Sequence, residues 1–74
     1  GWYNRGFFLL ERGLAEDAVS CLDNALRPGY RNAEILEEKA KALEEMGEDE
    51  RAEELVEEAD EIRGAAESQL VEEQ

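Results

Sequence analysis

The sequence predicts an all-α protein made of helical hairpins, and three observations support this. Glutamate, alanine, leucine and arginine dominate a chain of 74 residues with one proline and few aromatic side chains, a composition typical of helices. One glycine interrupts each of two helix-forming stretches, Gly13 in the first and Gly47 in the second. Small and apolar residues recur with the spacing of these glycines. Because a glycine inside a helix costs about 1 kcal/mol relative to alanine, both glycines are predicted to be turns.

The repeat has a period of 34 residues. Its identical pairs are Leu9 and Leu43, Gly13 and Gly47, Ala18 and Ala52, and Ala25 and Ala59. Its conservative pairs are Gly6 and Ala40, Trp2 and Leu36, and Leu22 and Val56. Matches between glutamates count for little because glutamate is so common in this chain. The small and apolar matches therefore carry the repeat.

The first hairpin is predicted to comprise helices over residues 2–12 and 15–26. Its apolar and small residues fall on one face of each helix, at i, i+4 and i+7: Trp2, Gly6 and Leu9, then Ala18, Leu22 and Ala25. Small side chains let the two helix axes approach closely, and we expect Trp2 to fill the core beside them. Cys21 lies next to this face and is predicted to be a small buried hydrophobe. Gly13 is predicted to take the left-handed conformation that ends the first helix.

The second hairpin repeats this design with helices predicted over residues 33–46 and 49–63. Asn32 is a suitable N-cap for its first helix, and Pro28-Gly29 marks a break before it. Gly64 is predicted to end its second helix, so that residues 65–73 form a separate capping helix anchored by Leu70. A single long helix running through Gly64 is the alternative.

These patterns resemble the tetratricopeptide repeat family, whose unit is a helix-turn-helix of 34 residues. The stretches "WYNRGFFL" and "LEEKAKAL" match its first-helix pattern, and "AVSCL" and "AEELV" match its second. Arg5 and Lys39 depart from the family's usual leucine, and the family's proline site falls on Tyr30 and Gly64. The resemblance implies an all-α helical-hairpin solenoid of four antiparallel helices, with repeats over about 1–32 and 33–63 and a capping helix over about 65–73.

The net charge of −13 lies entirely beyond Asn32, because acidic and basic residues balance before it. Such a polyanion is repelled by nucleic acid and by anionic lipid, so neither is expected as a partner. Three interpretations of the acidic helices stay open. They are a solvated surface, an adaptation to high salt, and a docking surface for a basic partner.

The chain offers no constellation for catalysis. It lacks histidine and has one cysteine, so we expect no nucleophile with an activating base, no zinc site and no cofactor. A chain of this size buries only about 60% of its unfolded surface, which disfavours a deep active site. The lone cysteine fits a reducing, cytoplasmic setting, and no apolar run is long enough for a membrane span. Since the chain starts at Gly1, we expect it to be an excerpt of a longer one.

The resemblance implies that the chain binds a peptide or partner protein along a concave surface formed by the first helix of each repeat. Carried over, this surface comprises Tyr3, Asn4, Phe7, Leu10 and Glu11, followed by Glu34, Glu37, Glu38, Lys41, Glu44 and Glu45. An aromatic patch beside carboxylates relieved only by Lys41 favours a ligand with an apolar anchor and a basic residue. A clamp for a carboxylate is not expected.

Three alternatives to this assignment stay open. Tyr3, Phe7 and Phe8 could pack against a preceding repeat. The chain could be an accessory or regulatory segment of a larger enzyme, or a module for self-association into a homo-oligomer.

Overall fold

The computed structural model describes residues 1–26 and 32–72, with side chains described as far as Ala65. Within these ranges the chain forms four helices and no strand, which confirms the all-α prediction. The helices are α1 (Trp2–Glu11), α2 (Ala15–Ala25), α3 (Ala33–Glu45) and α4 (Asp49–Glu72). Each begins at the residue that the sequence predicted.

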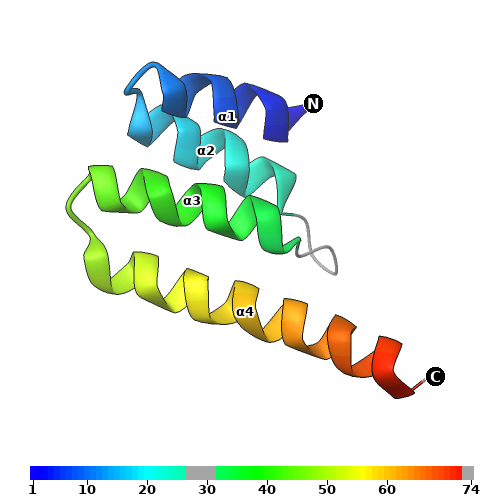
Figure 1. Cartoon of the computed structure of the whole chain (residues 1–74). Coiled ribbons are helices and arrows are strands. Elements are labelled where there is room, and N and C mark those ends of the chain that lie inside the picture. Colours follow the sequence, from blue (N-terminus) through cyan, green and yellow to red (C-terminus); the bar gives the residue numbers. More distant parts are fainter. Residues whose placement is uncertain (27–31, 73–74) are drawn as a thin grey trace.

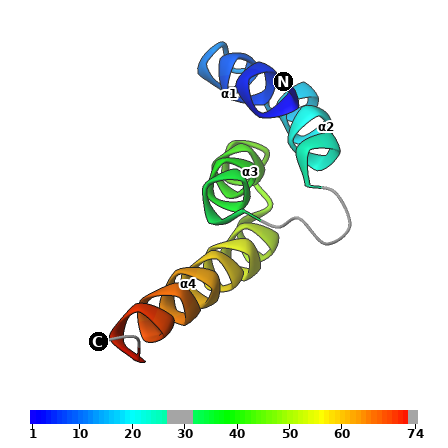
Figure 2. The ribbon, with the colours of Figure 1, turned by 90° about the vertical axis from the view of Figure 1, so that its right-hand side faces the viewer.

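The helices pack in chain order, as two hairpins placed side by side (Figure 1). α1 packs on α2, α2 packs on α3, and α3 packs on α4, while α1 also touches the edge of α3. Figure 2 shows the same order from a second direction, with α4 diverging from the other three helices. In the described part of the chain α1 and α4 do not contact each other. These two helices therefore have an outer side without a neighbouring helix.

Both predicted glycine turns are confirmed, and they share one geometry. Gly13 and Gly47 have φ angles of 79° and 81°, in the left-handed region that glycine adopts at little cost. In the first turn, the Leu14 amide donates to the Leu9 carbonyl at 3.0 Å and the Gly13 amide to the Leu10 carbonyl at 3.0 Å. Equivalent bonds, displaced by one repeat, close the turn at Gly47. This is the Schellman motif, which satisfies carbonyls that a helix end leaves free.

Asn32 caps α3 as the sequence predicted. Its side-chain oxygen accepts hydrogen bonds from the backbone amides of Glu34 at 2.7 Å and Ile35 at 3.4 Å. These amides have no carbonyl partner within the helix, so the cap replaces water there. The predicted break at Pro28-Gly29 lies outside the described residues.

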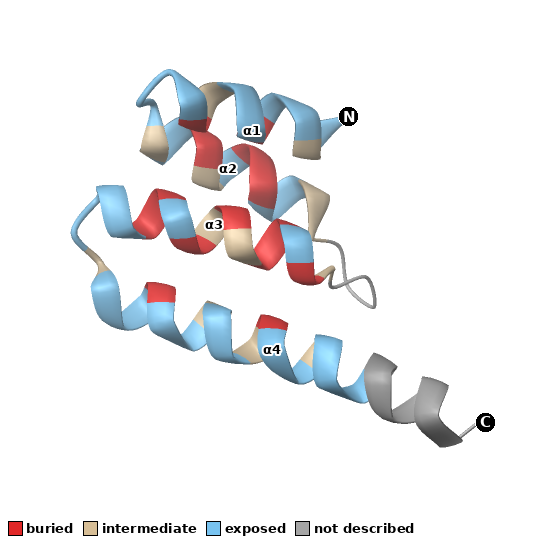
Figure 3. Ribbon diagram, in the orientation of Figure 1, coloured by how far each residue is buried: buried red, intermediate tan, exposed pale blue. Residues whose placement is uncertain are grey.

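The core consists of leucines surrounded by alanines along the facing sides of the helices (Figure 3). Leu22, Leu36 and Leu43 are the largest fully buried side chains. Gly6 is confirmed as the point where α1 approaches α2, because a β-carbon placed there would lie 2.7 Å from Leu22 Cγ. Cys21 is buried, as expected of a small hydrophobe.

The prediction that Trp2 belongs to the core is wrong. Its side chain is 41% exposed, whereas Leu36, its partner in the repeat, is fully buried. Leu36 lies between α2 and α4, but Trp2 lies on α1, which has no helix on its outer side. Val56 of α4 is also exposed and borders an open groove beside α3, although its partner Leu22 is fully buried.

The predicted break at Gly64 does not occur, so the separate capping helix is wrong and the alternative of one long helix holds. α4 runs without interruption to Glu72. Gly64 is followed by alanines and glutamate, and these strong helix formers offset its cost of about 1 kcal/mol. An uninterrupted helix cannot fold back over the second hairpin as a cap does. The side chain of Leu70 lies outside the described residues.

Candidate partner-binding surface

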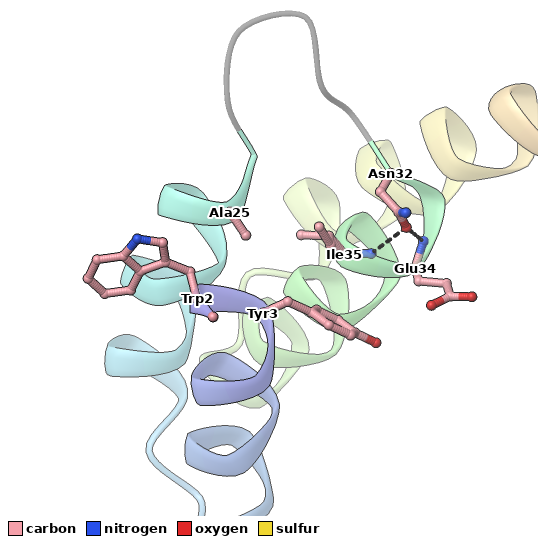
Figure 4. Close-up of a pocket in the computed structure, with 7 residues that line it drawn as sticks. Trp2, Tyr3, Ala25, Asn32, Glu34 and Ile35 are labelled. Atoms are coloured by element: carbon pink, nitrogen blue, oxygen red, sulfur yellow. Dashed lines mark hydrogen bonds between the residues drawn. The ribbon is translucent and has the colours of Figure 1, made fainter.

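Tyr3 of α1 faces α3 and borders an open groove of about 560 Å³. The groove is lined by Gly1, Trp2, Tyr3, Ala25, Asn32, Glu34 and Ile35. Figure 4 shows the Tyr3 ring extending toward α3, whereas the Trp2 indole points away to the opposite side. Ala25 and Ile35 provide apolar surface inside the groove, and Glu34 adds a carboxylate. The groove can therefore accept an apolar group beside a positive charge.

The environment of Tyr3 raises the pKa of its hydroxyl above the ordinary 10.0. Burial is the largest cause, because it disfavours the charged tyrosinate. The carboxylates of Glu38, Glu34 and Glu37 on α3 add to the shift, and the ammonium group of Lys41 opposes it. Tyr3 therefore stays protonated at neutral pH, with its hydroxyl available as a hydrogen-bond donor beside an acidic cluster.

A spectrophotometric titration can check this placement of Tyr3. In a Tyr30→Phe variant, where Tyr3 is the remaining tyrosine, we expect an ionisation midpoint above 10.0. Adding Glu38→Gln should lower the midpoint, because Glu38 is the neighbouring charge that raises the Tyr3 pKa most. Since the folded pKa lies above the unfolded one, the stability linked to neutral Tyr3 is complete below pH 10 and is lost as pH rises through the folded pKa. A midpoint at or below 10, or an equal effect of Glu61→Gln on α4, would contradict the placement.

The acidic cluster of α3 is less exposed and better neutralised than the sequence suggested. Glu38 is only 8% exposed, and its Oε1 accepts from the Lys41 ammonium at 3.1 Å. Glu37 accepts from the Arg63 guanidinium of α4 at 2.6 Å. The expectation that Lys41 alone relieves the cluster is therefore wrong, because α4 supplies a second cation.

The other predicted carboxylates of α3 remain available. Glu34, Glu44 and Glu45 are exposed and have no ion pair with another described residue. Glu44 borders a second open groove of about 440 Å³, on the side of α3 that meets α4. That groove is lined by Glu37, Glu38, Ala40, Lys41, Glu44 and Val56. The structure thus brings most of the predicted α3 residues together around it.

The predicted residues of α1 divide between surface and core. Asn4, Phe7 and Glu11 are exposed, and Tyr3 is half-buried. Leu10 is buried in a cluster with Ala18 and Ala42, so its side chain supports the fold and is not offered to a ligand. Of these predicted α1 residues, only Tyr3 lines either of the two grooves.

Sequence reasoning missed four residues that shape this surface: Ala25, Ile35, Val56 and Arg63. Ile35 carries the clearest available signal, since it is a large apolar residue next to Leu36 but outside the repeating face. Arg63 had no such signal, because it lies 26 residues from Glu37 in sequence. Only the packing of α4 on α3 brings these two side chains together.

Neither a metal site nor a membrane span accompanies this surface in the part of the chain that is described. Its acidic and cysteine side chains form no group of three able to hold a metal ion. None of the four helices, as far as they are described, has both the length and the apolar character needed to cross a bilayer. The chain matches no protein-family model, and no curated protein or solved structure is detectably similar to it.

Proposed function

We propose that the chain is a protein-interaction module of the tetratricopeptide type. Its ligand is a peptide segment with an apolar side chain next to lysine or arginine, bound along the side of the molecule where α1 meets α3. The observation that carries the proposal is the position of Tyr3, between an apolar groove and the carboxylates of α3.

The chemistry of the groove supports this ligand class. Tyr3 and Ile35 offer apolar and aromatic area, and aromatic side chains are common anchors of protein interfaces. Glu34 lines the groove without an ion pair in the described chain. A basic group on the ligand would gain a partner there, while an acidic ligand would be repelled. The resemblance in period and turn geometry adds an argument by analogy at the level of the fold.

Selection from a library of short random peptides tests the proposal. We expect the enriched peptides to combine a large apolar residue with lysine or arginine, and acidic peptides to be depleted. For one enriched peptide, Tyr3→Ala should weaken binding by roughly 1–3 kcal/mol, mainly through faster dissociation. Glu34→Lys should slow association, because that charge acts chiefly by steering.

Glu61→Lys is the matched control, since it makes the same charge change at an exposed position of α4. Circular dichroism must first show that each variant is as helical as the parent. Enrichment of acidic peptides, or equal binding by the parent and the folded Tyr3→Ala variant, would refute the proposed surface.

A further inference from the structure

The outer side of α1 combines exposed aromatic rings with arginines. Trp2 is 41% exposed and Phe8 is 51% exposed. The Arg5 guanidinium lies 5.3 Å from the Trp2 ring centre, and that of Arg12 lies 4.5 Å from the Phe8 ring centre. Neither arginine has an ion pair with another described residue. We call Trp2, Arg5 and Phe8 the α1 outer face.

The interface between the two hairpins shows how this face would be covered. Where α3 packs on α2, the Lys39 ammonium lies 2.7 Å from an Asp23 carboxylate oxygen. The Lys39 side chain is only 16% exposed, so its stem is part of the packing. Ala42 on the same helix is fully buried with Ala18 of α2, and Leu36 packs against Leu26 at the end of α2 as well as against α4. The contact thus joins an apolar seam to one partly buried ion pair.

Because the sequence repeats every 34 residues, α1 and α4 carry positions equivalent to those that form this interface on α3 and α2. Trp2, Arg5 and Phe8 occupy on α1 the positions that Leu36, Lys39 and Ala42 occupy on α3. On α4, Val56 and Glu57 occupy the positions of Leu22 and Asp23 on α2. Val56 and Glu57 are both exposed, and Glu57 has no ion pair with another described residue. We call Glu53, Glu57 and Asp60 the α4 outer face.

We propose that copies of this chain associate head to tail, with the α1 outer face of one copy packed on the α4 outer face of the next. Arg5 then pairs with Glu57 as Lys39 pairs with Asp23 inside each copy. The proposal stands on the repeat register and on charge, and it is independent of the peptide groove.

Charge selects this arrangement over a symmetric dimer. Two α1 outer faces would oppose arginine to arginine, and two α4 outer faces would oppose carboxylate to carboxylate. Only the heterologous contact places opposite charges together. Glu53 and Asp60 of α4 occupy the positions of Val19 in α2 and Leu26 at its C-cap, so further carboxylates surround the incoming Arg5.

The acidic residues Glu53 and Asp60, which stand where the first repeat has Val19 and Leu26, also limit the strength of the contact. Replacing two apolar residues by acidic ones removes apolar area from the seam, so we expect weak, concentration-dependent association. Each copy also carries a charge of −13, which opposes association at low salt. At about 0.15 M ionic strength the Debye length is about 8 Å, so charges in direct contact still act while long-range repulsion is largely screened.

Sedimentation equilibrium of the whole chain at this ionic strength tests the proposal. The average mass should rise with concentration in the parent. Arg5→Glu and Glu57→Arg should each weaken association by about tenfold or more, since each places like charges in contact. The double variant Arg5→Glu/Glu57→Arg should recover association to within about threefold of the parent, because it restores opposite charges.

Two matched controls make the same charge changes outside the proposed interface. Arg51 occupies the position of Asp17, and Glu54 the position of Ser20, and both of these counterparts stay exposed beside a packed neighbour. Arg51→Glu and Glu54→Arg should therefore leave association nearly unchanged. All substituted residues are exposed, and circular dichroism verifies that each variant stays helical.

Mixing the two single variants separates head-to-tail from symmetric contacts. Arg5→Glu keeps a native α4 outer face and Glu57→Arg keeps a native α1 outer face, and their two substituted faces carry opposite charges. A mixture should therefore associate in alternating order and grow past a dimer, whereas a symmetric contact would stop at the dimer. A parent that stays monomeric at millimolar concentration would overturn the proposal. So would association that Arg5→Glu abolishes and Glu57→Arg leaves intact, because that result indicates a symmetric α1 contact.

Discussion

Leu36→Ala is expected to lower the free energy of unfolding by about 2–5 kcal/mol, the usual cost of truncating a large core side chain. Leu36 is fully buried and packs with Ala33 and Ala59, beside the partly buried Leu26, Leu55 and Ile62, so its truncation leaves a cavity in the core. Domains have roughly 0.05–0.15 kcal/mol of stability per residue. A loss of this size would therefore leave a substantial unfolded population at 25 °C.

Trp2→Ala is the matched comparison, because Trp2 holds the same place in the first repeat. We expect it to cost about 1 kcal/mol or less, since the ring is exposed and contacts the Arg5 guanidinium, an interaction worth about 0.5–1 kcal/mol at exposed sites. Urea denaturation followed by circular dichroism measures both losses, with dilute protein so that association does not contribute. Equal losses of several kcal/mol would mean that Trp2 belongs to the core after all.

Gly6→Val is expected to lower the free energy of unfolding by about 1–3 kcal/mol or more, the range for overpacking a core. A β-carbon at this position would lie 2.7 Å from Cγ and 2.8 Å from Cδ2 of Leu22. Leu22 is fully buried, so its side chain has no free space into which it could move. The two helices must separate to admit the new side chain. Thermal unfolding should show a fall of about 4–8 °C for each kcal/mol.

Gly64→Ala makes the opposite prediction for another helical glycine. A β-carbon at Gly64 meets nothing within 4 Å, so the helix gains about 0.5–1 kcal/mol from the better helix former. Combining Gly6→Val with Leu22→Ala should cost less than the sum of the two single losses, because truncating Leu22 opens the space that valine needs. If Gly6→Val were neutral, or if Leu22→Ala only added to its cost, α1 and α2 would not be in close contact at Gly6.

The predictable features of this fold are those that neighbouring residues encode. Asn32 caps α3 through amides two and three residues away, and Gly13 ends α1 through bonds that span a single turn. The repeat then gave the positions of Ala40 and Leu43 in the core. No knowledge of distant contacts was needed for any of these.

The features that sequence reasoning got wrong depend on what lies beyond the helix in question. Trp2 matches Leu36 in pattern, but its side chain lies on a side of α1 that no other described helix covers. Gly64 resembles the turn glycines in type, yet no reversal of the chain follows it. The candidate site also depends on tertiary packing, since Arg63 reaches Glu37 only because α4 packs on α3.

The stacking of helices in chain order has a kinetic consequence. In the described residues each helix contacts mainly the helix before and the helix after it, so the contacts that form the fold close short loops. Chains with such local contacts fold in microseconds to milliseconds and can begin at any hairpin. Opening is local as well, because α1 can detach without unfolding α4. Amide hydrogens in α2 and α3, which have neighbours on both sides, should exchange with solvent most slowly.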